Sequence, residues 1–183
     1  MRIAVSGSHR TGKSTLLADL AERLPGYSTI PEPYELLEEE GYEFAQPPSL
    51  EDHLRQLQRS IELLAEGQED ALFERCPLDF VAYALCSPDG ASFEADEYLD
   101  LIRPAVASLS AIVFLPVEEP DRIVLAVSED GELRRAVDEK MREIVVEDIL
   151  GLDLEVLEVS GTRARRAATV VAWIRANRAA SRR

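Results

Sequence analysis

Cysteine, histidine and long apolar runs are scarce in this sequence, and each shortage excludes a class of protein. Cys76 and Cys86 do not form a C-x-x-C pair and there are two histidines, so we predict neither a disulfide framework nor a zinc site. No apolar run approaches the roughly 20 residues that span a bilayer. Residues 1–3 enter the first expected strand directly and leave no room for a signal peptide, so we expect a cytoplasmic protein that does not bind membranes.

Basic residues are also few ahead of the C-terminal stretch. The net charge of −15 argues against nucleic acid as a partner, because that binding requires cations that neutralise phosphates. Residues 161–183 hold seven of the 20 basic residues and no acidic one, so the first 160 residues carry 13 basic against 35 acidic side chains. We interpret the basic end as a helix that lies against an acidic body, in preference to an interaction arm.

The remaining composition is typical of one globular unit. At 183 residues, with 46% hydrophobic and 30% charged side chains, the chain can bury a full core without disulfides or metals. We therefore expect residues 1–183 to form a single domain. The sequence leaves open whether this domain acts as a monomer or as a homodimer.

The strongest functional signal lies near the N-terminus. Residues 7–14 satisfy G-x-x-x-x-G-K-[ST] between an apolar run and leucines at helical spacing, which predicts a phosphate loop between a strand and a helix. We expect Lys13 to reach the β- and γ-phosphates of a nucleoside triphosphate and Ser14 to bind Mg²⁺. A turn made only for packing would leave Lys13 unexplained. The predicted nucleotide-binding residues are Gly7, Ser8, His9, Arg10, Thr11, Gly12, Lys13, Ser14 and Thr15.

A second candidate is a glutamate between two prolines, Pro31-Glu32-Pro33, which follows the expected second strand at residues 27–30. Proline stiffens this backbone and disfavours helix at the residue that precedes it. In an open parallel sheet, chemistry sits at the carboxyl ends of the strands, so Glu32 would face the phosphate loop and could accept the proton of a substrate hydroxyl. The alternative is a surface glutamate, because the chain has 35 acidic residues.

A third candidate is Glu74-Arg75, which ends a short apolar run. A carboxylate at a strand end is typical of a Walker B position, so Glu74 is the second predicted Mg²⁺ ligand. Arg75 could orient Glu32 and bridge to substrate or phosphate, because a guanidinium makes bidentate contacts with either. The alternative is a structural ion pair of Arg75 with Glu74 or Asp79.

The second half of the chain supplies candidate arginines. Leucine, valine, methionine and isoleucine at helical spacing predict a long helix over 133–149, with Arg134 and Arg135 in its first turn, where the helix dipole disfavours cations. We predict a lid around 117–136 that brings these two arginines to the transferring phosphoryl group. A Gly-Thr turn opens the last helix, and Arg163 beside it could cover an adenine ring or lie on the surface.

Residues 35–48 combine acidic and aromatic side chains without a clear period, and we expect a substrate-side loop there. Ser49 and Asp52 have the spacing of a capping box, which predicts a helix start. His53, Gln56 and Arg59 share one face of that helix; we favour a solvated surface over the wall of a polar pocket.

With these residues in view, most of the chain resembles the small P-loop kinases of the nucleoside and nucleotide kinase type. Pro31-Glu32-Pro33 is similar to the segment that carries their general base, and Glu74-Arg75-Cys76 resembles their Glu-Arg-Ser motif, whose Glu approaches the metal and whose Arg holds the substrate end. Cys76 replaces the serine of that motif. Residues 130–134 look more like single-domain ATPases grouped near ribosylnicotinamide kinases.

These patterns predict a three-layer α/β/α P-loop NTPase fold with a five-stranded parallel sheet in the order 2-3-1-4-5. The predicted function is ATP- and Mg²⁺-dependent transfer of the γ-phosphate to a hydroxyl of a small, nucleoside-like acceptor. The main alternative is a regulatory or switch NTPase that signals to a protein partner, and a third is a nucleotide-binding module without chemistry. The choice between ATP and GTP stays open.

Overall fold

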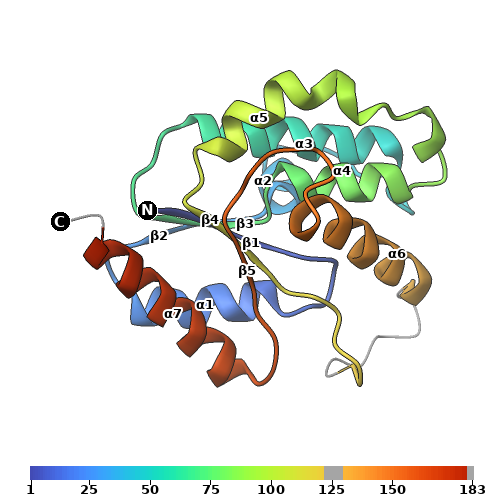
Figure 1. Ribbon diagram of the computed structural model, residues 1–183. Coiled ribbons are helices and arrows are strands. Elements are labelled where there is room, and N and C mark those ends of the chain that lie inside the picture. Colours follow the sequence, from blue (N-terminus) through green and yellow to red (C-terminus); the bar gives the residue numbers. More distant parts are fainter. Residues whose placement is uncertain (122–129, 181–183) are drawn as a thin grey trace.

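The computed structural model describes residues 1–121 and 130–180, and its centre is a five-stranded parallel sheet (Figure 1). The strands are β1 (Arg2–Ser6), β2 (Ser28–Ile30), β3 (Ala71–Glu74), β4 (Ala111–Phe114) and β5 (Val156–Glu158). Their order in the sheet is β2-β3-β1-β4-β5, which confirms the predicted fold class and topology. The central strand β1 is buried from Ile3 onward, as expected of a strand covered on both faces.

Helices cover both faces of this sheet. The α-helices are α1 (Lys13–Arg23), α2 (Pro33–Glu39), α3 (Leu50–Ala65), α4 (Pro77–Cys86), α5 (Leu99–Ala107), α6 (Gly131–Met141) and α7 (Arg163–Ala180). Two 3₁₀ turns, η1 (Gly90–Ser92) and η2 (Ala95–Tyr98), precede α5, and a π-helical turn, η3 (Arg142–Val146), continues α6. Figure 1 shows α1 and α7 on one face and α3 to α6 on the other, while α2 packs against α3.

The alternation of side chains along β1 builds two separate cores. Ile3 and Val5 pack with the leucines of α1 and the apolar face of α7, whereas Ala4 belongs to the larger core beneath α3, α4 and α6. Successive residues of a strand point to opposite faces, so one strand serves both layers. In the described ranges 1–121 and 130–180, no helix is long and apolar enough to cross a membrane.

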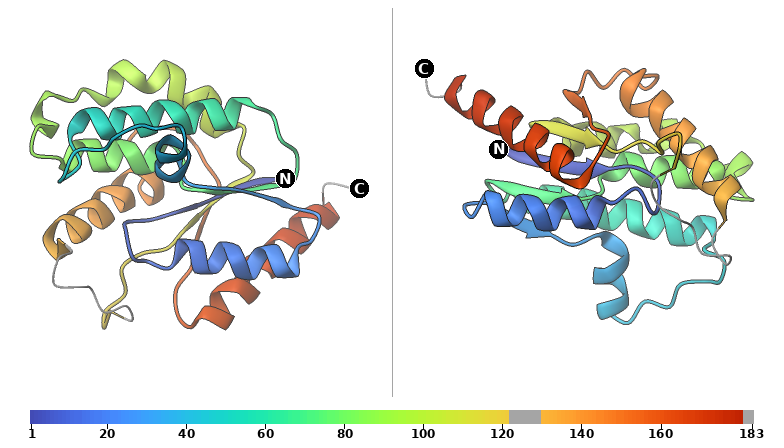
Figure 2. Two further views of the ribbon diagram at one scale, coloured as in Figure 1. Left: turned by 180° about the vertical axis from the view of Figure 1, so that it is seen from behind. Right: turned by 90° about the horizontal axis from the view of Figure 1, so that it is seen from below.

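The basic C-terminal helix lies against the acidic body, as predicted. Ala167, Val170 and Ile174 of α7 are fully buried against the α1 side of the sheet. Its arginines pair with body carboxylates: Arg163 with Asp19, Arg166 with Glu118, and Arg178 with Asp70. Figure 2 shows α7 running beside α1 along this face. Three arginines of this helix therefore help to hold it against the body.

Three local predictions were wrong. Residues 35–39 of the loop expected over 35–48 belong to α2, because the fixed φ of proline suits the first helical position that Pro33 occupies. His53 and Gln56 are buried, at 8% and 7% exposure, where the sequence favours a solvated surface. The expected helix over 133–149 ends earlier, at η3, and leaves Ile149 55% exposed. The capping box at Ser49 and Asp52 is present as predicted.

Candidate active site

The phosphate loop, residues 7–14, connects β1 to α1 and includes the first two residues of that helix. The backbone geometry requires both of its motif glycines. Gly7 has a φ of 146°, and a Cβ built there would lie 2.5 Å from the carbonyl oxygen of Leu115. Gly12 precedes α1 with a φ of 91°, a left-handed conformation that costs glycine little. The loop can therefore curl tightly beside β4 and enter α1, and the N-terminus of that helix can bind an anion.

Lys13 lies over this loop with its side chain buried, and Nζ donates a hydrogen bond to the carbonyl oxygen of Ser8 at 2.7 Å. Burial, and after it the positive charge of Arg75, lower the pKa of Lys13 to about 7, while nearby carboxylates oppose this shift. A cation held in this position is costly by itself and is stabilised by any anion placed beside it. The electrostatic environment of Lys13 therefore favours the predicted contact with a phosphate.

Ser14 and Glu74, the two predicted metal ligands, meet in the structure. The Ser14 hydroxyl donates to Oε1 of Glu74 at 2.7 Å, although 60 residues separate them. Burial raises the pKa of the Glu74 carboxyl, and the hydrogen bond from Ser14 opposes the rise. One hydroxyl and one carboxylate fit Mg²⁺, which takes the rest of its oxygen ligands from water and substrate phosphates. Among residues 1–121 and 130–180 there is no cluster of three or more His, Cys, Asp or Glu that could hold a metal by itself.

Arg75 connects Glu32 with the phosphate loop. Its Nε donates to Oε2 of Glu32 at 2.7 Å, and Nη1 donates to the carbonyl oxygen of Gly7 at 3.0 Å. Arg75 itself has a left-handed φ of 69°, a conformation that side chains rarely adopt and that often marks functional sites. Glu32 has an extended backbone, as the following proline predicts. Glu32 and Arg75, two of the predicted catalytic residues, are therefore brought together at the loop.

Two residues of α4 that the sequence patterns did not assign to the site also hold the loop. Asp79 is fully buried and accepts hydrogen bonds from the backbone N–H groups of Gly7 and Cys76, both at 3.0 Å. One helical turn later, the Tyr83 hydroxyl accepts from the N–H of His9 at 2.8 Å. Cys76 and Asp79 have the spacing of a capping box. This pattern is the feature of the sequence from which a structural role of Asp79 could have been predicted.

The Tyr83 ring also contacts two side chains near the phosphate loop. The guanidinium of Arg75 lies over it at 5.3 Å from the ring centre, and the His53 ring stacks on it at 5.4 Å. Burial lowers the pKa of His53, as does the nearby Arg75, whereas Asp52 acts in the opposite direction. His53 is therefore buried against Tyr83, and the solvated surface that the sequence favours for this residue is wrong.

The two arginines predicted for the lid lie in different places. Arg134 is buried and donates to the carbonyl oxygens of His9 at 2.9 Å and of Arg10 at 3.0 Å, and it forms an ion pair with Asp121. Arg135 is exposed on α6 and is not brought to the loop in the structure. The predicted lid around 117–136 includes residues 122–129, which lie outside the described residues. The guanidinium of Arg134 therefore contacts the carbonyl side of the loop.

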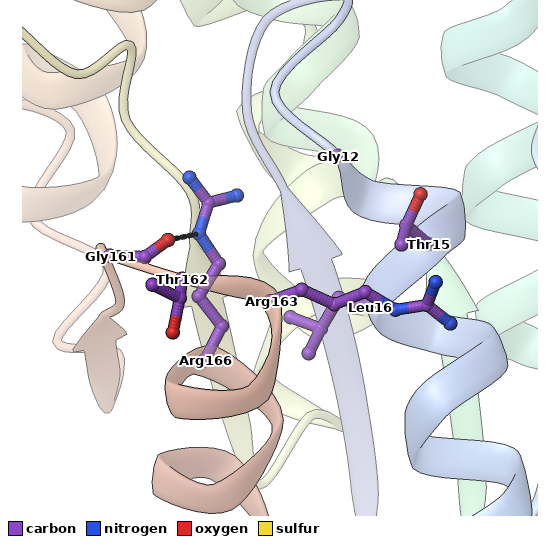
Figure 3. A pocket seen from close by; sticks show the side chains of 7 residues that line it. All are labelled: Gly12, Thr15, Leu16, Gly161, Thr162, Arg163 and Arg166. Carbon is purple, nitrogen blue, oxygen red and sulfur yellow. Dashed lines mark hydrogen bonds between the residues drawn. The ribbon is translucent and has the colours of Figure 1, made fainter. Parts of the chain in front are cut away.

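A cavity of about 170 Å³ lies between the start of α1 and the turn before α7 (Figure 3). It is lined by Gly12, Thr15, Leu16, Gly161, Thr162, Arg163 and Arg166. The predicted residue Arg163 borders it, but its guanidinium forms two hydrogen bonds with Asp19, at 2.8 and 2.6 Å. Figure 3 shows this side chain reaching from α7 toward α1. A flat ring in the cavity would lie directly beyond the end of the phosphate loop.

A parallel sheet in the order β2-β3-β1-β4-β5, with a phosphate loop after its central strand, defines the P-loop NTPase fold in the form found in small kinases. The chain belongs to the AAA domain family: the family model AAA_28, described as an AAA domain, matches residues 2–166. A search of curated protein sequences finds no match to the chain.

Solved structures share this fold at low sequence identity. Deoxyadenosine kinase from M. mycoides with bound dATP is 17% identical, with a TM-score of 0.67 over 96% of this chain and 100% of that one. Thymidylate kinase from Candida albicans is 17% identical, with a TM-score of 0.63 over 97% and 92%. The NadR protein in complex with NAD and AMP-PNP is 20% identical, with a TM-score of 0.66, but the match covers 93% of this chain and 48% of that one. At these identities the likeness shows the fold.

Proposed function

We propose that this protein is an ATP- and Mg²⁺-dependent phosphotransferase that moves the γ-phosphate to a hydroxyl of a small, nucleoside-like acceptor. The observation that carries the proposal is the Glu32–Arg75 pair, which puts a carboxylate at the end of β2 and joins it through one guanidinium to the phosphate loop. A nucleotide-binding module without chemistry has no need of a carboxylate in that place. The similar folds of deoxyadenosine kinase and thymidylate kinase agree with this choice.

Each residue then has one part in the transfer. The loop amides and Lys13 hold the β- and γ-phosphates, and Ser14 and Glu74 would hold Mg²⁺, which neutralises charge on the phosphates when bound. Glu32 accepts the proton of the acceptor hydroxyl while its oxygen attacks the γ-phosphorus. The bond from that phosphorus to the bridging oxygen breaks, and ADP leaves. Arg75 keeps the carboxylate turned toward the acceptor, so it is a positioning residue in this scheme.

The charge around Arg75 favours a hydroxyl acceptor over a phosphorylated one. Its guanidinium pairs with Glu32 and lies 3.4 Å from a carboxylate oxygen of Asp79, so two negative charges already face one positive charge. An acceptor phosphate would add further negative charge beside these carboxylates, where like charges repel. We therefore propose a nucleoside-like acceptor without a phosphate group. A nucleoside should stimulate turnover more than its monophosphate does.

The cavity of about 170 Å³ between α1 and α7 is the proposed site for the donor base. Its wall combines the apolar side chain of Leu16 with the methylene groups of Arg163, surfaces that suit a flat ring. NadR was solved with the ATP analogue AMP-PNP, which agrees with an adenine donor in a protein of this fold. Competition between ATP and GTP for one fluorescent nucleotide would test this proposal.

The direct test of the function is ADP release from ATP with and without a panel of nucleosides, their monophosphates and small alcohols. A phosphotransferase is stimulated by at least one acceptor and yields a phosphorylated product that mass spectrometry can identify. If none of the panel stimulates ADP release but a protein partner does, the switch NTPase becomes the better description. The single domain over 1–183 and the cytoplasmic location stay predictions, and these assays do not depend on them.

A further inference from the structure

The phosphate loop is held from its outer side by arginines. A loop that turns its N–H groups inward toward an anion turns carbonyl oxygens outward. In this chain Arg75 donates to the carbonyl of Gly7, Arg134 to those of His9 and Arg10, and Arg166 to that of Thr11. Lys13 and the Thr11 hydroxyl donate to the remaining carbonyl, that of Ser8. Five consecutive carbonyls of the loop are thus bonded, four of them to a guanidinium.

We propose that Arg134 of α6 and Arg166 of α7 form a clamp that fixes the shape of the phosphate loop and so sets the affinity for the donor's phosphates. This assigns Arg134 a positioning role in the ground state, in place of the lid role that the sequence suggested. The proposal rests only on that part of the proposed function in which the loop binds a polyphosphate. It does not depend on the acceptor or on phosphoryl transfer.

The contacts of Arg134 argue against a guanidinium that moves to the transferring phosphoryl group. Nε and Nη2 each donate to a loop carbonyl, and Nη1 contacts the carboxylate of Asp121. The residue is 3% exposed. A lid role would require all three nitrogens to leave their partners and would leave two carbonyls of the loop without a donor, which is unfavourable in a buried place. These contacts fix the guanidinium of Arg134 on the carbonyl side of the phosphate loop.

Arg166 completes the clamp from the other side. Nη1 donates to Thr11 O at 2.6 Å, Nε donates to Gly161 O at 3.0 Å, and Nη2 pairs with Glu118 at 2.6 Å. Glu118 also accepts from the N–H of Gly161 at 2.6 Å. The segments that follow β4 and β5 are therefore tied to the loop through charged hydrogen bonds, which are stronger than neutral ones. Both guanidinium charges also lie close enough to the loop to stabilise bound phosphates.

The test measures binding of inorganic tripolyphosphate and of ADP by calorimetry, with Arg134→Ala, Arg134→Lys and Arg166→Lys. Tripolyphosphate has no base, so a loss of its binding reports on the loop and not on the cavity beside Arg166. We expect each Kd to rise by about 10- to 100-fold, because charged hydrogen bonds to buried carbonyls are lost. The kcat for ATP turnover at saturating ATP should fall by less than about 3-fold, as for lost ground-state binding. Lysine should rescue only in part, because it cannot span two carbonyls.

Two controls show whether a change in affinity comes from the clamp. Lys140→Ala removes a cation from the same helix, where it pairs with Glu143, and should leave the tripolyphosphate Kd unchanged. Added guanidinium should lower the tripolyphosphate Kd of Arg134→Ala and should not change that of Lys140→Ala. If Arg134→Ala does not fold, the two lysine variants carry the test. An unchanged Kd together with a large fall in kcat would assign Arg134 to the transition state, and unchanged values of both would remove any role; either result overturns the clamp.

Discussion

The carboxylate of Glu32 and the guanidinium of Arg75 lie 2.7 Å apart, and the register of the sheet places them there. Ile30 of β2 pairs with Phe73 of β3. Glu32 lies two residues after Ile30, and Arg75 lies two residues after Phe73. Because the strands are parallel, both side chains leave the sheet at the same edge, which is also the edge of the phosphate loop. The pair therefore follows from strand register and from the left-handed turn at Arg75.

Replacement of Glu32 by Gln should remove the proposed general base and keep its shape. We expect phosphoryl transfer to the acceptor to fall by about 10²- to 10⁴-fold. The Kd for ATP should stay nearly unchanged, because the carboxylate faces the acceptor. Glu35→Gln, on the exposed face of α2, is the matched control. A variant that transfers phosphate as fast as its parent would exclude Glu32 as the base.

The metal ligands can be tested by Mg²⁺ titration of ATP turnover. Ser14→Ala and Glu74→Gln should each raise the Mg²⁺ concentration needed for half-maximal turnover, because each removes one oxygen ligand or its charge. Stability should change little, since the bond between the two side chains is solvent-exposed. Glu69→Gln, an exposed position before β3, serves as the control. A Glu74→Gln protein that melts early but titrates Mg²⁺ like its parent would mean that the Ser14–Glu74 contact is only structural.

Lys13 should make the stability of the nucleotide-free protein depend on pH. Its pKa falls from 10.5 to about 7 on folding, so between these pH values the unfolded chain binds more protons than the folded one. Stability contributed by this group therefore rises with pH across that window. Lys13→Met cannot titrate, so its stability advantage over the parent should be largest near pH 7 and shrink toward pH 10. Urea unfolding of both proteins at several pH values measures this, and parallel curves would contradict it. The same variant should lose ATP turnover.

Asp79→Asn should weaken both the fold and the loop. The side chain is fully buried and accepts from two backbone N–H groups, and the amide can accept well from only one. A buried donor without a partner costs about 1–3 kcal/mol. We expect a loss of that size in urea unfolding, together with a raised Kd for ATP because Gly7 is released. Asp89→Asn, in an exposed turn, is the control. Lost stability with unchanged affinity in the folded protein would limit Asp79 to capping α4.

Local chemistry explains what could be predicted. The phosphate loop, the extended backbone at Glu32 and the capping box at Ser49 each depend on a few adjacent residues, so their patterns can be recognised in the sequence. The alternation of strands and helices likewise limited the sheet to few topologies. By contrast, α2 was missed because it is short and has too few apolar residues to show a helical period. Its packing against α3, where Leu37 is buried at 2% exposure, is a tertiary contact that the sequence does not reveal.

The sequence by itself determined that this protein has a phosphate loop, a parallel sheet and acidic residues at its strand ends, because each of these depends on neighbours in the chain. Only the tertiary structure decided which distant residues complete the site. Tyr83, Arg134 and Arg166 meet the loop across 74 to 155 residues of chain. The positions of these three residues in the sequence do not indicate that they contact the loop. A hydrogen bond to a backbone carbonyl or amide can be made by any suitable donor or acceptor that the fold brings within reach.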